Sequence, residues 1–150
     1  MAHIRPRRSL GQNFLIDPNI ARKIVASLRA PLGARVVEIG AGTGALTGIL
    51  FSRYPDMLAV EVDERAIDHL RSEHSGLDIR HLDVLALNWG RLAESGTGPL
   101  FVIGNLLYHI TSPILFDLLE NAPVLGEAVL MMQLEVAQRL VAEPRTRSYG

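Results

Sequence analysis

A glycine-rich stretch, Gly40-Ala41-Gly42-Thr43-Gly44, follows the apolar run of residues 36–39 and is the first candidate for chemistry in this sequence. Glycine adopts positive φ without steric cost and lets a ligand approach the bare backbone, as a nucleoside-binding turn between a strand and a helix requires. The glycines alternate as GxGxG rather than GxGxxG, and the acidic residue Glu38 stands just before them. This combination favours S-adenosylmethionine over a dinucleotide. The alternative is a tight turn with a purely structural role.

Two acidic residues stand where the next two apolar runs end. Glu61 follows the glycine-rich stretch by about 20 residues, the spacing at which an acid accepts hydrogen bonds from ribose hydroxyls. Asp83 follows the third apolar run, where a carboxylate can accept a hydrogen bond from the exocyclic amine of adenine. We therefore expect both residues to bind an adenosine-containing cofactor. The alternatives are a surface acid for Glu61 and a helix N-cap for Asp83.

The fourth apolar run ends in Asn105-Leu106-Leu107-Tyr108. The amide oxygen of Asn105 and the backbone carbonyl of Leu106 can accept the two N–H bonds of a target amine. The ring of Tyr108 can stack on a base, a contact that suits unpaired RNA. These residues are the candidate catalytic group, and the alternatives are a strand-end turn and a buried tyrosine.

The elements that must position these residues alternate between strand and helix. The first helix begins at the Asp17-Pro18 cap and lasts about three turns. We expect strands at residues 36–39, 57–61, 78–81, 100–104 and 127–133, and later helices at residues 64–73, 86–93, 112–120 (capped by Ser112) and 136–142. Such alternation predicts an α/β fold with a doubly wound, mostly parallel, Rossmann-like sheet. Ligands of these sheets bind beyond the carboxyl ends of the strands, where the candidate residues lie.

Composition is that of one soluble globular domain. The chain has 150 residues, of which 48% are hydrophobic and 21% charged. It has no cysteine, which excludes disulfides and thiolate metal sites, and we expect no metal. No apolar run approaches the roughly 20 residues of a membrane span, and no signal peptide is apparent. We expect a cytoplasmic protein, a monomer, with no membrane contact.

Basic residues are concentrated at the N-terminus although the net charge is only -1. Arg5, Arg7 and Arg8 all precede Asp17, the first acidic residue. Such an arm can neutralise phosphates, and we expect Arg7 and Arg8 to bind RNA. The alternative is a solvated tail.

Several motifs together resemble the ribosomal RNA adenine N6-dimethyltransferase family, which modifies adenines near the 3′ end of small-subunit rRNA. The matching pieces follow the family's order and spacing over nearly the whole chain, at residues 8–15, 37–47, 60–63, 83, 104–108 and 133–139. The box Gly11-Gln12-Asn13-Phe14-Leu15 combined with the Asn105 motif is the most specific part of the match.

The resemblance implies an S-adenosylmethionine-dependent methyltransferase fold and places the cofactor. Asn13 and Leu15 would line the cofactor pocket together with Gly40, and Asn105 would receive the target amine. Glu61 would hold the ribose, and Asp83 the adenine. The implied activity is dimethylation of small-subunit rRNA during ribosome biogenesis, on the immature small ribosomal subunit.

The sequence departs from the family pattern in two places. Leu107 stands where the family usually has proline, and His109 stands where many relatives carry asparagine or serine. We expect the imidazole of His109 to face solvent or to pack rather than to act in catalysis.

Relatives also continue beyond Gly150. We therefore expect an arm and cofactor-contacting box at residues 1–16, and a methyltransferase domain at residues 17–150 that stops before its last strands, with the helical C-terminal domain absent. The alternatives are a large-subunit rRNA adenine methylase of the macrolide-resistance type, a non-catalytic ribosome-assembly factor, and a small-molecule methyltransferase.

Overall fold

The structure is a computed structural model, and it describes residues 5, 15 and 17–145, with the side chain of residue 108 left out. Its strands are β1 (Val36–Ile39), β2 (Leu58–Glu61), β3 (Asp78–His81), β4 (Leu100–Asn105) and β5 (Leu125–Met131). Its α-helices are α1 (Pro18–Ser27), α2 (Thr47–Arg53), α3 (Glu64–Glu73), α4 (Trp89–Glu94), α5 (Thr111–Glu120) and α6 (Leu134–Leu140). Short 3₁₀ helices lie at η2 (Val84–Ala86), η3 (Tyr108–Ile110) and η4 (Ala122–Val124).

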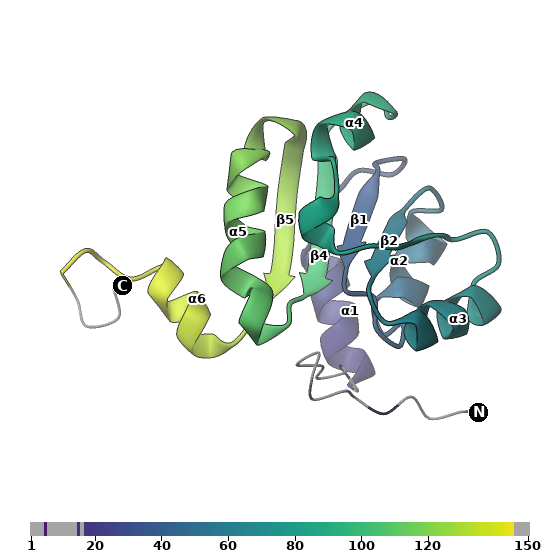
Figure 1. Cartoon of the computed structure of the whole chain (residues 1–150), viewed down its shortest axis with the longest axis horizontal. Coiled ribbons are helices and arrows are strands. Elements are labelled where there is room, and N and C mark those ends of the chain that lie inside the picture. The colour runs from purple at the N-terminus through teal and green to yellow at the C-terminus, as the bar shows by residue number, and fades with distance from the viewer. Residues whose placement is uncertain (1–4, 6–14, 16, 146–150) are drawn as a thin grey trace.

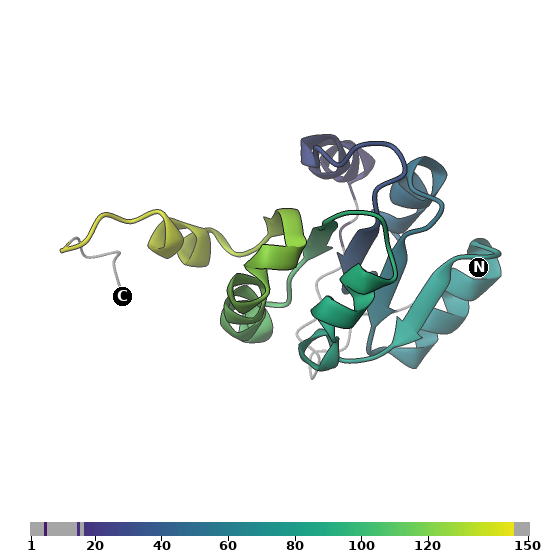
Figure 2. The same cartoon turned by 90° about the horizontal axis from the view of Figure 1, so that it is seen from above.

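The strands form one sheet in the order β3-β2-β1-β4-β5, and every pair in it is parallel. The order reverses between β1 and β4, so the sheet has the topological switch point at which doubly wound folds bind ligands. Helices cover both faces, with α1 and α2 on one side and α4 and α5 on the other (Figures 1 and 2). The expected α/β, doubly wound, Rossmann-like fold is confirmed.

Side chains alternate between the two faces of the sheet and form two apolar clusters. Leu50 of α2 and Leu70 of α3 pack on the face to which β1 contributes Val36. Trp89 of α4 and Ile114 of α5 pack on the opposite face. Parallel strands buried on both sides read as continuous apolar runs, which is why β1 and β2 are recognisable in the sequence.

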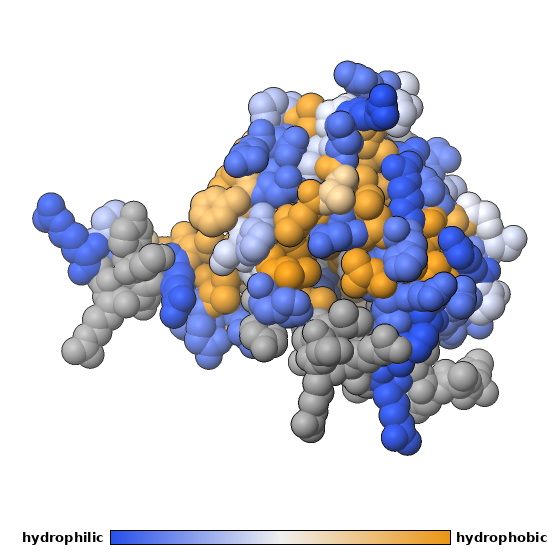
Figure 3. Space-filling model, viewed as in Figure 1, coloured by the Kyte–Doolittle hydropathy of each residue, from blue (hydrophilic) through white to orange (hydrophobic). Residues whose placement is uncertain are grey.

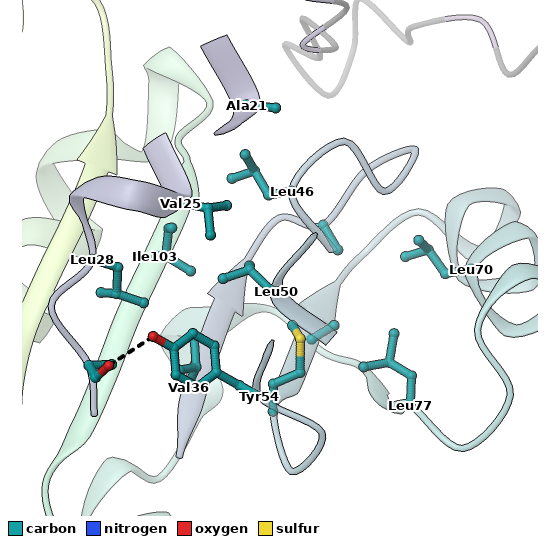
Figure 4. Packing of buried hydrophobic residues seen from close by; sticks show 14 residues of the cluster. Ala21, Val25, Leu28, Val36, Leu46, Leu50, Tyr54, Leu70, Leu77 and Ile103 are labelled. Carbon is teal, nitrogen blue, oxygen red and sulfur yellow. Dashed lines mark hydrogen bonds between the residues drawn. The ribbon is translucent and has the colours of Figure 1, made fainter. Parts of the chain in front are cut away.

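The segment between α1 and β1 is fixed by a buried tyrosine. The hydroxyl of Tyr54, at the end of α2, donates a hydrogen bond of 2.8 Å to the carbonyl of Ala30, and Figure 4 shows this contact inside the apolar cluster. Tyr54 is 1% exposed, so an unpaired hydroxyl there would carry a desolvation cost. The bond therefore ties the segment after α1 to the end of α2.

The expected boundaries hold for β1, β3 and α3, and α1 begins at the expected Asp17-Pro18 cap, whereas other boundaries shift. Ser112 is not a cap, because η3 leads directly into α5 and places Ser112 inside the helix. Strand β5 begins and ends two residues earlier than expected, since its register pairs Asn105 of β4 with Met131. The helix expected at residues 86–93 divides into η2 and α4, and α6 also starts earlier than expected.

One side of the molecule exposes large apolar side chains. On α5, Phe116 is 68% exposed and Leu119 is 69% exposed, while α6 buries none of its residues. In Figure 3 hydrophobic residues gather on the side where α5 lies. An apolar surface of this kind is typical of a contact region. In the described part of the chain, no helix has the length and apolar character needed to cross a bilayer.

Candidate functional site

A cavity of about 330 Å³ opens at the carboxyl ends of β1, β2 and β4. Its lining includes six residues singled out in the sequence, namely Leu15, Gly40, Glu61, Asp83, Asn105 and Leu106. The parallel topology explains this convergence, because every strand of the sheet ends at the same edge. Asn13, Arg7 and Arg8 lie outside the described residues. Tyr108 begins η3 between Leu107 and His109, which both line the cavity, and its stacking role stays a prediction.

The glycine-rich turn takes the conformation that its sequence predicts. Gly40, Gly42 and Gly44 have φ of 69°, 55° and 90°, a region that other residues rarely adopt. A Cβ on Gly40 would also stand 3.7 Å from the carbonyl oxygen of Asn105 on the neighbouring strand. The turn therefore brings the backbones after β1 and β4 close together at the floor of the cavity.

Three backbone amides of the described residues donate hydrogen bonds to the carboxylate of Glu61. Its Oε2 accepts a hydrogen bond of 2.7 Å from the amide of Gly42 in the turn. Its Oε1 accepts from the amides of Val62 and Asp63, at 2.8 and 2.9 Å. Glu61 is thus not a free surface acid, and it fixes the shape of the glycine-rich turn from the adjacent strand.

Asp83 is the helix N-cap that the alternative interpretation predicted, and it also lines the cavity. Its Oδ1 accepts a hydrogen bond of 3.0 Å from the amide of Leu85, so the residue caps η2. The same residue lines the cavity and is exposed to it. Capping engages one of the two carboxylate oxygens, so the cap and the expected adenine contact are compatible.

The segment after β4 is anchored at both ends. The amide of Leu106 donates to the carbonyl of Met131 on β5, at 2.9 Å, and the hydroxyl of Thr111 donates to the carbonyl of Leu107, at 3.0 Å. Leu107 has φ of -68° and ψ of 133°, within the range that proline imposes. The backbone conformation that proline supplies in the family is therefore retained with leucine.

Replacing Leu107 by proline is expected to raise the free energy of unfolding by about 0.4–1 kcal/mol. The native φ already fits proline, and in the described residues no hydrogen bond from the Leu107 amide would be lost. Urea unfolding of both proteins measures the change. Proline at Leu32, an exposed residue next to Pro31, is the control for a loop proline outside the cavity. A clear loss of stability in L107P would show that the loop differs from this geometry.

The most deeply buried polar side chain of the cavity lining is Glu38, which the sequence marks as part of the glycine-rich motif without indicating a role for it. Glu38 on β1 is 1% exposed, lines the cavity, and accepts a hydrogen bond of 2.7 Å from the hydroxyl of Thr47, the first residue of α2. Burial raises its pKa from the usual 4.5 to about 8; the Thr47 bond opposes the rise and the charge of Glu61 adds to it. An acid inside an apolar strand was the available sequence signal.

The remaining lining is largely apolar. Val62 and Val84 line the cavity, as their positions after β2 and β3 allow, while Leu85 does not. His109 also lines the cavity and is exposed. Ile110 and Ile114 complete the wall on the α5 side.

The described lining of the cavity contains acidic side chains. In the part of the chain that the structure describes, the lining holds the carboxyl groups of Glu38, Glu61 and Asp83 and contains no lysine or arginine. Such a lining disfavours the phosphates of a dinucleotide and suits a ligand that carries positive charge. Among the described residues, no group of three or more histidine, aspartate or glutamate side chains is placed to hold a metal ion.

Comparison with known proteins agrees with this geometry. The family model described as ribosomal RNA adenine dimethylase matches residues 4–150. Ribosomal RNA small subunit methyltransferase A of Salinibacter ruber is 55% identical over 97% of this chain and 49% of its own length. The corresponding protein of Prosthecochloris aestuarii is 47% identical over 98% of this chain and 56% of its own length. The chain thus spans about half the length of the curated relatives it matches.

Solved structures show the same fold. A dimethyladenosine transferase from Plasmodium falciparum has a TM-score of 0.78 at 26% identity, over 92% of this chain and 50% of that one. The 23S rRNA methyltransferase ErmE has a TM-score of 0.73 at 30% identity, over 92% of this chain and 53% of that one. With the family model covering nearly every residue, the chain belongs to the ribosomal RNA adenine dimethylase family.

Proposed function

We propose that this chain binds S-adenosylmethionine and transfers methyl groups to the N6 amines of adenines near the 3′ end of small-subunit rRNA, in the cytoplasm. The observation that carries the proposal is the acid-lined cavity in which Glu61, Asp83 and Asn105 meet at the carboxyl edge of the sheet. The names of the relatives, which are small-subunit methyltransferases, support the choice of substrate. The immature small ribosomal subunit is the proposed partner.

The acidic lining of the cavity and the bare backbone of its glycine-rich turn support this choice of cofactor. Positive φ at Gly40 and Gly42 leaves backbone without side chains beside the lining, where an extended ligand can lie against the turn. Glu61 would accept a hydrogen bond from a ribose hydroxyl through the lone pair of Oε2 that its three backbone contacts leave open, and Asp83 would accept one from the adenine amine. Leu15 would cover the cofactor from the arm side.

The cofactor supplies an activated methyl group on a sulfonium, so the protein needs chiefly to position the amine. The amine of adenine is a poor nucleophile because its lone pair is delocalised into the ring. Hydrogen bonds to the side-chain oxygen of Asn105 and the carbonyl of Leu106 would favour a pyramidal nitrogen whose lone pair points at the methyl group. Tyr108 would hold the base by stacking, and Arg7 and Arg8 would bind phosphates nearby. The proton leaves the alkylated nitrogen to water.

Two measurements test the proposal in sequence. Calorimetry should show binding of S-adenosylhomocysteine and no binding of NADH, whose phosphates the acidic lining would repel. Transfer of tritiated methyl groups should then label small subunits that lack the modification, with the label mapping to N6 of adenines near the 3′ end. Binding of cofactor without labelling of any subunit would favour the assembly-factor alternative.

A second candidate is supported by the similarity to ErmE. That protein is a 23S rRNA methyltransferase, and a large-subunit target would place the label on 23S rRNA instead. Identity of 55% to a small-subunit enzyme against 30% to ErmE favours the small subunit. Parallel reactions with isolated large and small subunits distinguish the two candidates. The division at residue 17 between arm and methyltransferase domain belongs to the same proposal.

A further inference from the structure

Glu38 is a buried acid that the transfer reaction as described above does not use. It lies on the same face of β1 as Val36, and alternation places Glu61 of β2 and Asn105 of β4 on that face as well. Its register partners, Ala59 and Ile103, are fully buried and apolar. Glu38 therefore stands between buried apolar residues of the neighbouring strands, lines the cavity, and accepts a hydrogen bond from the buried hydroxyl of Thr47.

In the described part of the chain, the cavity lining around Glu38 contains no lysine or arginine. Strand β2 contributes Glu61, whose negative charge acts on Glu38, and α2 contributes the neutral hydroxyl of Thr47. Strand β4 contributes the amide of Asn105, and farther along the described lining lie Asp83 and His109. Two carboxyl groups thus share a water-poor end of the cavity, a situation in which one of them keeps its proton.

We propose that Glu38 is a positioning residue that gives up its proton when the positively charged methyl donor enters the cavity, and regains it once the donor has become the uncharged thioether. This inference rests on the cofactor part of the proposed function. The proton leaves to solvent on binding and returns from solvent after transfer. Glu38 forms no covalent bond, and the methyl group passes from sulfur to nitrogen without it.

The size of the effect follows from the electrostatics. A unit positive charge at about 6 Å from a carboxyl group, at an effective dielectric constant of about 20, lowers its pKa by roughly two units. Burial holds the pKa of Glu38 at about 8 in the ligand-free cavity. A shift of roughly two units would bring the pKa below neutrality, so that Glu38 becomes ionised on binding at pH 7.

The consequence is discrimination between substrate and product cofactors. Above neutral pH the carboxylate attracts the sulfonium, whereas the thioether gains nothing from the ionised form. The ratio of affinities for S-adenosylmethionine and S-adenosylhomocysteine is therefore expected to rise by about tenfold or more between pH 6 and pH 8. Product release would then be favoured by the same residue that retains the donor.

Calorimetry in phosphate and in Tris buffers at pH 7 tests this inference, because their ionisation enthalpies differ. The wild-type protein should release about 0.8 proton on binding S-adenosylmethionine, or its stable cationic analogue sinefungin, and markedly fewer on binding S-adenosylhomocysteine. Glu38→Gln should abolish the difference in proton release between the ligands. Subtracting the proton release of Glu38→Gln from that of the wild type removes the contribution of the ligands' own amino groups.

Thr47→Val is the second variant, and it is useful even if Glu38→Gln folds poorly. Loss of the Thr47 hydrogen bond removes the contact that lowers the pKa of Glu38. The pH at which the ratio of the two cofactor affinities is halfway through its rise should therefore increase. Equal proton release for both cofactors, or release unchanged in Glu38→Gln, would overturn the inference and leave the proposed function intact. Failure of the wild-type protein to bind either cofactor would overturn both.

Discussion

Replacing Asn105 by alanine is expected to slow methyl transfer by about 100- to 1000-fold, the usual effect of removing one hydrogen-bonding partner of a reacting group. The amide oxygen of Asn105 is the side-chain acceptor proposed for the target amine, and the Leu106 carbonyl cannot orient that amine alone. The dissociation constant for S-adenosylhomocysteine should change by less than about threefold, since Glu61 and Asp83 would still hold the nucleoside. Single-turnover transfer to small subunits and calorimetry measure the two quantities.

A matched control separates this effect from a general loss of folding. Asn19→Ala removes an exposed asparagine of α1 that lies outside the cavity and accepts a hydrogen bond only from Arg22 among the described residues. Its transfer rate should match that of the wild-type protein. Undiminished methylation in Asn105→Ala would refute the proposed role of Asn105.

Local sequence patterns were sufficient to predict much of the fold. Helix α3 has its expected bounds because Asp63 caps it, with a side chain that accepts from the amide of Arg65, and Ala66 and Leu70 recur at helical spacing on the buried face. Strand β3 also has its expected bounds. Ser112 failed as a cap because the preceding residues already form η3, in which the Thr111 hydroxyl bonds back to the Leu107 carbonyl, and α5 starts at Thr111.

The place of the site was predictable, and its internal contacts were not. Parallel strands must end at one edge, so the convergence of Glu61, Asp83 and Asn105 followed from the alternation of elements alone. The bond from Glu61 to the Gly42 amide depends on the register of β1 against β2, which a single sequence does not state. The environment of Glu38 depends likewise on how α2 places Thr47 above the sheet.

The ligand-free protein is expected to lose stability as pH rises from about 5 to above 8, and Glu38→Gln should abolish much of this loss. The pKa of Glu38 is about 8 in the folded state and about 4.5 when exposed on unfolding. Between these values the folded state holds the additional proton, so unfolding releases it and becomes more favourable at higher pH. The slope is at most about 1.4 kcal/mol per pH unit, and the total reaches at most roughly 5 kcal/mol.

Urea unfolding of both proteins at pH 5.5, 7 and 8.5 measures this difference. Glutamine keeps the shape of Glu38 and an oxygen for the Thr47 hydroxyl but never ionises. The free energy of unfolding of Glu38→Gln should therefore rise relative to that of the wild-type protein as pH rises. Glu127→Gln is the matched control, because Arg29 lowers the pKa of Glu127 and its ionisation is complete below this range. The difference in free energy of unfolding between Glu127→Gln and the wild type should be constant from pH 5.5 to 8.5. If the free energies of unfolding of the wild type and Glu38→Gln depend on pH in the same way, Glu38 is already ionised in the empty cavity. An ionised Glu38 has no proton to release when the cofactor binds, so this result would contradict the inference.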